Sequence, residues 1–445
     1  MKPLHLFLFI QVIAIVLSVR IELSKTELAN PLDYYREYQT DDINQIEVGE
    51  DEISHKRHLS SKSRTSFNKQ DSLKYVGSIY MGSHKQKMDV IFDTGSEKLW
   101  VPDQTWQDWY GMIPYQSSSS KNFTNSNKNI SIEYVNTSVN GTECSDLVGL
   151  NKDEMVPLDF LLATELEKKS RNDESNGLIG LSPIVYPSFS LLEKLCKNNV
   201  TANRMFVFHF GTSFLNPAYL EIGEMSNKAD YEKAQYSELV LNNYGYYSHW
   251  NLNVHMSYKG KMMSHSFDYG TIDSGSPFIL MPQEDLDNLL GNITEYIIYD
   301  EQVKFYYTSW SGVEEFDDLE LKFEKHTIKV PPKNYITYSW FKCYFLLQSS
   351  EDVYDQKDKI DNHILLGDIA LRGQTVIHDF QEKRIGFVPR KWYFDDTDSE
   401  IFQKFLSFWL LLLILIYFCC PCVFSKCNRK RGVRLHDSEV SVINT

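Results

Sequence analysis

The chain contains the stretch VIFDTGS at residues 90–96 and, with its aspartate 180 residues further on, the stretch TIDSGS at residues 271–276. Each copy is a run of apolar residues followed by aspartate, a small hydroxyl residue, glycine and a second small hydroxyl residue. Downstream of each copy comes an apolar-apolar-glycine triplet, at 178–180 and 365–367. A single Asp-Thr-Gly is common as a simple turn, but two copies with matching triplets indicate an internal repeat.

The repeat makes physical sense if two similar β lobes face each other and each contributes one carboxylate, Asp93 and Asp273, on a tight loop. Gly95 and Gly275 would let neighbouring backbone approach closely because they carry no Cβ. Short hydroxyls would orient the loops and the carboxylates. These hydroxyls belong to Thr94, Ser96, Ser274 and Ser276.

Two carboxylates held about 3 Å apart cannot both ionise, so Asp93 and Asp273 are predicted to share one proton and to titrate as a pair. The ionised partner would take a proton from a water between them, while the protonated partner donates to a substrate carbonyl. This chemistry is hydrolysis of a peptide bond by an activated water. We expect no metal ion, no cofactor and no covalent intermediate.

From about Tyr75 to Pro389 the chain resembles the pepsin-like aspartic proteases of eukaryotes. The resemblance rests on KYVGSIYMGSHKQKMDVIFDTGSEKLWVP (74–102), on FDYGTIDSGSPFILMP (267–282) and on HILLGDIALRGQTVIHDFQEKRIGFVP (363–389). It implies an all-β fold, a bilobal pepsin-like double β-barrel with a pseudo-twofold repeat. It also implies an amino-terminal pro-segment, and therefore a zymogen, with aspartic-type endopeptidase activity on polypeptide substrates and sensitivity to pepstatin.

The family has a hairpin flap with a tyrosine over the cleft, and the resemblance makes Tyr134 that residue, hydrogen-bonding toward Trp100. Tyr134 lies seven residues before Gly141. The chain departs from the family at Val135-Asn136-Thr137, where glycines are usual. β-Branched residues resist the positive φ that a tight hairpin tip often needs. We therefore expect a flap that is shaped or hinged differently.

Residues 1–18 are predicted to form a secretory signal peptide, because a short apolar run follows Lys2. Residues 19–70 are polar and mixed in charge, which is typical of a pro-segment or linker. Lys56-Arg57 within it is either a processing site or an incidental basic pair. The two lobes are predicted at 71–225 and 226–392, with their best short helices at 188–198 and 284–293.

The stretch from Phe405 to Ser425 holds 21 uncharged residues between two lysines, which is long enough to span a bilayer. It predicts a transmembrane helix at 405–425, after a juxtamembrane linker at 393–404. The basic tail at 426–445 would lie in the cytosol by the positive-inside rule. The chain is thus predicted to be a single-pass type I membrane protein, similar in layout to beta-secretase. Its catalytic part would be luminal or extracellular, in the secretory or endolysosomal pathway or at the cell surface.

Six Asn-x-Ser/Thr sequons lie in the predicted luminal part and predict a glycoprotein. They begin at Asn122, Asn129, Asn136, Asn140, Asn199 and Asn292. A glycan on either sequon of the flap, Asn136 or Asn140, would narrow access to the cleft.

Only Cys144, Cys196 and Cys343 precede the membrane segment, so at most one disulfide can form among them. The resemblance implies a cysteine pair within the second lobe, but Cys343 has no such partner there. Cys144 with Cys196, or a cross-lobe pair with Cys343, both remain open. The cysteines at the inner membrane edge are palmitoylation candidates, namely Cys419, Cys420, Cys422 and Cys427.

The formal net charge of the 445 residues is −15. The last twenty residues have a net charge of +3, so the rest of the chain has a net charge of −18. This balance argues against nucleic-acid binding. Protonation would relieve the repulsion among these carboxylates in an acidic vesicle. No zinc-peptidase, nucleophile-elbow or phosphate-loop motif is present.

We expect a monomer that cleaves peptides, most effectively at acidic pH. The alternative is a catalytically silent pepsin-like membrane protein that only binds peptides, and the altered flap is the one feature that favours it. An adhesion or receptor ectodomain would account for the sequons and the anchor but not for the repeat.

Overall fold

The computed structural model describes residues 19–22, 24–25 and 74–390, with gaps inside the last range at 106–111, 135–136, 169–174, 184–186, 212–217, 224, 226–227, 243–244, 264, 302, 310–315, 340 and 354–362. The predicted signal peptide, most of the predicted pro-segment, and the predicted linker, transmembrane helix and tail lie outside these residues. Within the described part, no helix is long and apolar enough to cross a membrane.

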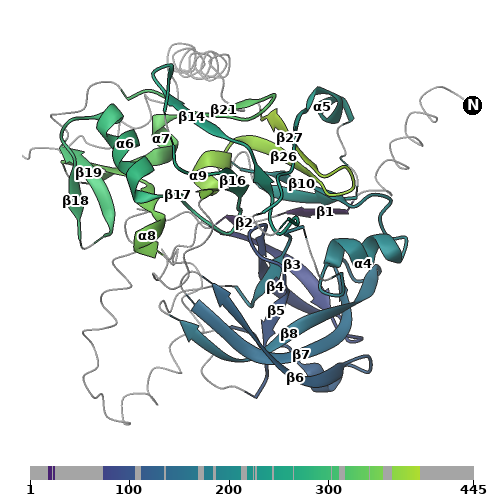
Figure 1. Ribbon diagram of the computed structural model, residues 1–445. Helices are drawn as coiled ribbons and strands as arrows, with labels where there is room; N and C mark the ends of the chain where they lie inside the picture. Colours follow the sequence, from purple (N-terminus) through teal and green to yellow (C-terminus); the bar gives the residue numbers. More distant parts are fainter. Residues whose placement is uncertain are drawn as a thin grey trace, which may run out of the picture. The chain divides into compact units, whose positions relative to one another are not determined.

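Strands dominate the described residues, and those of the first lobe up to Gly180 form, together with Ser24–Lys25, one eight-stranded sheet (Figure 1). Its order is β2-β3-β4-β9-β5-β8-β7-β6. The strands are β2 (Ser24–Lys25), β3 (Tyr75–Met81), β4 (Gln86–Asp93), β5 (Trp100–Pro102), β6 (Thr124–Tyr134), β7 (Thr137–Gly149), β8 (Met155–Lys168) and β9 (Leu178–Gly180).

The second lobe is divided among three smaller sheets, with orders β13-β16-β25-β17-β24, β15-β14-β20-β21 and β18-β19-β23-β22. The first of them contains the second aspartate motif. The strands are β13 (Asn251–Leu252), β14 (His255–Tyr258), β15 (Lys261–Met262), β16 (Tyr269–Ile272), β17 (Ile279–Met281), β18 (Ile298–Asp300), β19 (Phe305–Ser309), β20 (Leu319–Lys322), β21 (Thr327–Val330), β22 (Ile336–Ser339), β23 (Lys342–Phe345), β24 (Leu347–Ser349) and β25 (His363–Leu366).

A six-stranded sheet takes strands from both sides of the predicted lobe boundary at 225/226. Its order is β1-β11-β10-β26-β27-β12. The strands are β1 (Val19–Glu22), β10 (Met205–His209), β11 (Tyr219–Ile222), β12 (Gln235–Glu238), β26 (Gln374–Asp379) and β27 (Arg384–Pro389). Strands β1 and β2 come from the predicted pro-segment, so the first residues of that segment are part of the sheets.

Short helices connect the strands, and both helices predicted from sequence are confirmed. Helix α6 spans Gln283–Ile293, and α4 spans Leu191–Lys197. Helix α4 starts later than predicted because the hydroxyl of Ser190 accepts a hydrogen bond from the amide of Glu193 and caps it there. The remaining short helices are η1 (Ser117–Ser119), α5 (Lys228–Lys233), α7 (Pro332–Tyr335), α8 (Ser350–Val353) and α9 (Asp368–Leu371).

The two sequence motifs are built into the same strand arrangement. Strand β4 pairs in parallel with β9, and β16 pairs in parallel with β25, so each triplet runs beside its own aspartate strand. Strands β5 and β17, which follow the aspartate loops, pair antiparallel with β9 and β25 on the other side. Strands that are buried on both faces consist of continuous apolar runs, and such runs precede both aspartates and begin both triplets. The internal repeat is therefore a repeat of structure.

A buried contact joins the first strand of one lobe to a helix of the other. The phenol of Tyr75, in β3, donates a hydrogen bond to Asp368, the first residue of α9. Asp368 also receives a hydrogen bond of 2.6 Å from the guanidinium of Arg372. The ring of Tyr75 packs edge-on against Phe208 and Phe210, with centroids 5.0 and 5.4 Å away. Burial makes this charged network costly to leave incomplete.

The three described cysteines are free thiols, so neither pairing considered from the sequence is formed. Each sulfur has its own surroundings. Cys144 in β7 lies 3.6 Å from the hydroxyl of Thr142, and Cys196 in α4 lies 3.2 Å from that of Thr201. Cys343 is buried within β23. The number of cysteines limits how many disulfides can form, but it does not say how far apart the cysteines lie in the fold.

Replacing Tyr75 by phenylalanine tests the contact between the lobes. The Tyr75→Phe variant keeps the ring packing but removes the donor to a buried carboxylate. We expect the free energy of unfolding to fall by about 1.5–3 kcal/mol, measured by urea denaturation. The matched control is Tyr80→Phe on the same strand, which should change stability by less than about 0.5 kcal/mol. Equal effects of the two substitutions would show that the hydroxyl of Tyr75 contributes nothing specific.

Candidate active site

The two motif aspartates occupy equivalent places at the ends of parallel strands. Asp93 is the last residue of β4, and Asp273 directly follows β16. Both carboxylates are buried, with 6% and 8% of each residue exposed. In each, the Oδ1 atom accepts a hydrogen bond of 2.8 Å from the amide of the glycine two residues later, Gly95 or Gly275. The two loops therefore have the same local geometry.

The glycines bring the two carboxylates together. A Cβ added to Gly95 would lie 2.5 Å from Oδ1 of Asp273, and one added to Gly275 would lie 2.3 Å from Oδ1 of Asp93. Each glycine thus lies against the carboxylate of the opposite lobe. Any side chain at either position would displace that carboxylate, which is why the pattern needs glycine at both places.

Thr94 and Ser274 join the two loops through reciprocal hydrogen bonds. The amide of Thr94 donates to Oγ of Ser274 at 3.0 Å, and the amide of Ser274 donates to Oγ1 of Thr94 at 2.8 Å. Each hydroxyl in turn donates across the interface to a backbone carbonyl, that of Ile272 at 3.0 Å or that of Phe92 at 2.8 Å. Both residues are fully buried. The four bonds fix one loop relative to the other.

The triplets hold the aspartate loops from behind through backbone hydrogen bonds. The amide of Leu181 donates to the carbonyl of Asp93 at 2.7 Å, and the amide of Asp273 donates to the carbonyl of Leu366 at 3.1 Å. A Cβ on Gly180 would lie 2.5 Å from the carbonyl oxygen of Ser96. The triplets end in glycine because the aspartate loop passes directly over them.

The second hydroxyl of each motif has a different environment. The hydroxyl of Ser276 donates to the carbonyl of Phe278 at 3.4 Å. The hydroxyl of Ser96 is buried and has no hydrogen-bond partner among the described residues. The symmetry of the two loops therefore ends at these serines, and Ser96 is the one near the flap.

Burial and the neighbouring carboxyl group act together on the pKa of Asp273. Burial raises the pKa of Asp273 well above its usual range, and the charge of Asp93 and the hydrogen bond with it raise the pKa further. The amides of Gly275 and Ser276 act in the opposite direction. Two such groups titrate as a pair, and in this pair Asp273 is the member that favours the protonated form.

Tyr134, at the end of β6, contacts the site from the predicted flap. It packs against a cluster that contains Trp100. Burial and the charge of Asp93 raise the pKa of the phenol, while the side chains of Ser96 and Trp100 oppose that shift. Tyr134 Oη, Trp100 Nε1 and Ser96 Oγ are nevertheless buried without a well-formed hydrogen bond to any described residue. Tyr134 is thus a close neighbour of Trp100, but a full hydrogen bond between them is not formed.

A third strand supports the hairpin that carries Tyr134. Strand β7 pairs with β6 up to Tyr134↔Thr137, and with β8 as far as Thr137↔Lys168. Beside Gly141 the register shifts by one residue, and a Cβ there would lie 2.1 Å from the carbonyl oxygen of Leu162. Val135 and Asn136 lie outside the described residues, so the expectation of an unusual tip stays a prediction.

Two residues that the sequence did not single out connect the aspartate loops. The indole Nε1 of Trp250 donates to the carbonyl of Leu181 at 2.9 Å, and Leu181 holds the carbonyl of Asp93. The carbonyl of Trp250 accepts from the amide of Ile272, just before Asp273. A lone tryptophan and a leucine beside a triplet carry no motif, so only the fold shows this connection.

Glu97 directly follows the first motif and was also missed. Burial raises the pKa of its carboxyl, and the charge of Lys98 opposes that shift. Its place next to Ser96 brings a third acidic group close to the first aspartate loop.

The described sequon asparagines are on the surface or partly exposed. Asn122, Asn129 and Asn199 are exposed, and Asn140 is half-buried in β7. Asn292 lies in α6, where its amide donates to the carbonyl of Asn288 at 2.7 Å. The sixth, Asn136, lies outside the described residues.

Comparison with known proteins gives low overall identity spread over most of the chain. Plasmepsin IV of Plasmodium falciparum is 25% identical over 338 residues, 72% of this chain and 70% of that protein. Pregnancy-associated glycoprotein 6 of Ovis aries is 24% identical over 329 residues, 71% of this chain and 81% of that protein. Candidapepsin-3 of Candida albicans is 23% identical over 347 residues, 72% of this chain and 81% of that protein.

The family model of eukaryotic aspartyl proteases matches residues 74–390. This range contains both aspartate motifs, both triplets and all the described strands except β1 and β2. It is well over half of the chain. The chain therefore belongs to the eukaryotic aspartyl protease family.

Proposed function

We propose that this protein is an aspartic endopeptidase that hydrolyses peptide bonds with a water held between Asp93 and Asp273. One observation carries the proposal. Two buried carboxylates each accept a hydrogen bond from their own glycine amide and each lie against the glycine of the opposite loop. A purely structural pair of buried like charges would be costly without a compensating partner, so this arrangement favours a working dyad.

In the proposed reaction, ionised Asp93 takes a proton from the water as its oxygen forms a bond to the substrate carbonyl carbon. Protonated Asp273 gives its proton to the carbonyl oxygen, so no free oxyanion develops. Asp93 then gives its proton to the amide nitrogen, while Asp273 takes a proton from one hydroxyl of the tetrahedral intermediate. The C–N bond breaks, the carboxyl product forms, and the dyad regains its starting protonation. The raised pKa of Asp273 supports this division of roles. Membership of a protease family supports polypeptides as the substrates.

Tyr134 would close over the substrate and reduce access of bulk water, because its phenol lies near Asp93. Strands β6, β7 and β8 are paired in series, which favours motion of the β6–β7 hairpin and β8 as one unit. Water exclusion strengthens the electrostatic interactions inside the site.

Single substitutions of the dyad test the proposed chemistry. We expect Asp93→Asn and Asp273→Asn each to lower kcat on unfolded protein substrates by at least about 10²-fold. The assay uses the full-length protein in detergent between about pH 3 and 7, with and without pepstatin. The matched control is Asp89→Asn on β4, which removes an aspartate four residues before the dyad and should retain activity. A parent protein that binds peptides at every pH without cleaving them would support the silent peptide-binding alternative instead.

Stability as a function of pH tests the raised pKa of Asp273. Between its usual pKa of about 3.9 and its raised pKa in the folded protein, Asp273 is ionised when unfolded and protonated when folded. The folded state binds more protons there, so this contribution to stability is lost as pH rises through the window. The side-chain amide of the Asp273→Asn variant imitates the neutral carboxyl and avoids that loss. We therefore expect the Tm of this variant, relative to the parent, to increase from pH 4 upward.

The control for this measurement is again Asp89→Asn, which keeps both carboxyl groups of the dyad and should therefore lose stability with rising pH as the parent does. A constant Tm difference between Asp273→Asn and the parent would mean that the folded protein does not perturb the carboxyl of Asp273.

We further propose that the protease is a glycosylated monomer with a single type I membrane anchor at 405–425, and that it acts in an acidic compartment. The uncharged 21-residue run, the basic tail and the negative balance of the remaining chain support this proposal. The exposed positions of Asn122, Asn129 and Asn199 are compatible with glycans.

Two arginines in the apolar run test the anchor. Each should cost about 2.5–3.5 kcal/mol at the centre of a membrane helix, so we expect Leu412→Arg/Ile414→Arg to move the protein from the carbonate-resistant membrane fraction into the soluble luminal or secreted fraction. The control places the same charges in the tail, Ser438→Arg/Ser441→Arg, and should stay membrane-bound. Equal partition of both variants would contradict a membrane anchor at this place.

A further inference from the structure

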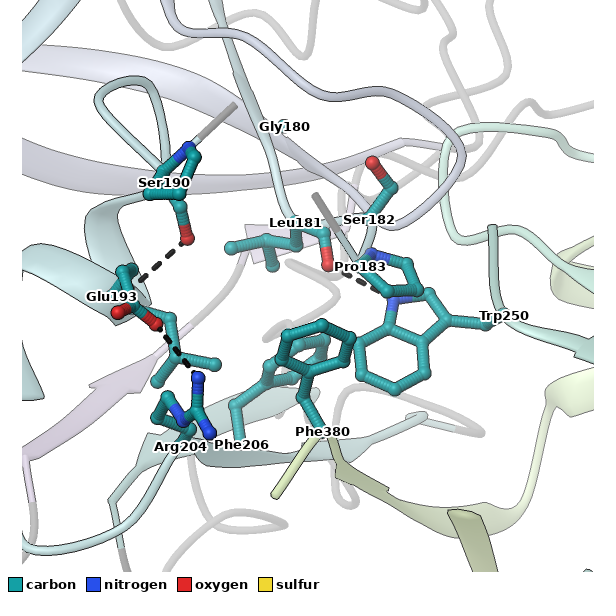
Figure 2. Close-up of a pocket in the computed structure, with 12 residues that line it drawn as sticks. Gly180, Leu181, Ser182, Pro183, Ser190, Glu193, Arg204, Phe206, Trp250 and Phe380 are labelled. Atoms are coloured by element: carbon teal, nitrogen blue, oxygen red, sulfur yellow. Dashed lines mark hydrogen bonds and ion pairs between the residues drawn. The ribbon is translucent and has the colours of Figure 1, made fainter. Parts of the chain in front are cut away.

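A cavity of about 200 Å³ lies between the loop after β9, helix α4 and the six-stranded sheet (Figure 2). Its aromatic wall is formed by Phe206 in β10, Trp250 and Phe380. Figure 2 shows these three rings together, with the Glu193–Arg204 pair beside them. Neither motif aspartate nor Tyr134 lines the cavity, so it is separate from the proposed catalytic site.

The volume of the cavity suits a small molecule with one or two rings. An engineered apolar cavity of about 150 Å³ binds benzene, and drug-sized ligands need pockets of about 300–1,000 Å³. The cavity lies between these limits. Prolines and leucines add apolar surface beside the aromatic wall, namely Leu181, Pro183, Pro187 and Leu192.

The polar end of the cavity contains one acidic and one basic lining residue, Glu193 and Arg204, and Lys197 lies outside the lining. Glu193 pairs with Arg204 at 3.3 Å and with Lys197 at 3.4 Å, so two cations share one carboxylate. The guanidinium of Arg204 also lies over the ring of Phe380, 5.7 Å from its centroid. Arginine presents five donors in a planar fork, and one carboxylate does not use them all. A ligand carboxylate beside Arg204 would therefore be favourable.

The wall of the cavity is hydrogen-bonded to both aspartate loops. Leu181 donates to the carbonyl of Asp93 at 2.7 Å and accepts from the indole of Trp250 at 2.9 Å. Trp250 accepts from the amide of Ile272 at 3.1 Å. A molecule packed against Leu181 and Trp250 thus touches the two residues whose backbones position the loops of Asp93 and Asp273.

We propose that this cavity binds a small aromatic carboxylate, and that its occupancy is coupled to the geometry of both aspartate loops. The ring system stacks among Phe206, Trp250 and Phe380, and the carboxylate pairs with Arg204. The hydroxyl of Ser190, which accepts from the amide of Glu193 at 3.2 Å, still has its proton to donate to the ligand.

Binding is tested by titration calorimetry of the full-length protein in detergent with 2-naphthoate, and with 2-naphthylmethanol as the uncharged probe. We expect saturable one-to-one binding of 2-naphthoate, at least about five-fold tighter than the alcohol because of the charge-assisted hydrogen bonds. The Arg204→Gln variant should remove this preference and leave binding of the alcohol unchanged. The matched control is Arg384→Gln, since Arg384, like Arg204, pairs with a carboxylate and covers an aromatic ring, but does not line the cavity.

A second variant, Leu192→Trp, fills the cavity and should abolish binding of both probes. Absence of saturable binding to the parent would overturn the proposal. So would binding that survives both Arg204→Gln and Leu192→Trp, or that pepstatin displaces from the parent competitively, since the ligand would then occupy another site.

The coupling is tested by amide hydrogen exchange, which needs no catalytic activity. With 2-naphthoate bound, we expect exchange at Leu181 and Ile272 to slow by at least about three-fold, because the ligand packs against Leu181 itself and against Trp250, the acceptor for the amide of Ile272. Arg384→Gln should show the same slowing, and Leu192→Trp should show no response to the ligand. Unchanged exchange at both amides in the saturated parent would overturn the coupling. These readouts hold whether or not the protein cleaves peptides.

Discussion

The structure depends on four hydrogen bonds that Thr94 and Ser274 make across the two aspartate loops. Two of them join Thr94 and Ser274 to each other, and the other two end on the carbonyls of Ile272 and Phe92. Each lobe alone offers only half of a catalytic pair, and the spacing of its carboxylate from the other lobe is set by these bonds. Because both residues are fully buried, a partner lost on one side leaves the other side unsatisfied, at a cost of about 1–3 kcal/mol. The same contact therefore holds the lobes together and defines the distance on which a shared proton depends.

Much of the fold and the aspartate pair could be predicted from the sequence because the repeat is written in residue types that have few substitutes. Gly95 and Gly275 lie where a Cβ would be within 2.5 Å of a carboxylate oxygen, so no other residue type fits at these two positions. The triplets ending in Gly180 and Gly367 are constrained in the same way. Aspartate, glycine and a small hydroxyl at fixed spacing thus encode a three-dimensional contact over 180 residues.

Other parts of the site leave no such trace in the sequence. The Trp250–Leu181 link uses one indole and one backbone carbonyl, and any residue has a carbonyl. The cysteines show the reverse case, in which residue types in the sequence allow a feature that the fold does not form. Three thiols allowed one disulfide, but their positions in β7, α4 and β23 leave all three free. Strand β1 is short and mixed in charge, and its pairing with β11 depends on a partner far along the chain rather than on its own pattern.

That pairing also affects the order in which the chain can fold during synthesis. Val19–Glu22 must wait for Tyr219–Ile222 to be made before it can join the six-stranded sheet, and synthesis at about 5–20 residues per second makes that delay roughly 10–40 s. Strand β10 must likewise wait for its other neighbour, β26, which ends at Asp379. The sheet that joins the lobes is thus completed last, since its strand β27 ends at Pro389, whereas β25 completes the pairing beside the second aspartate loop at Leu366.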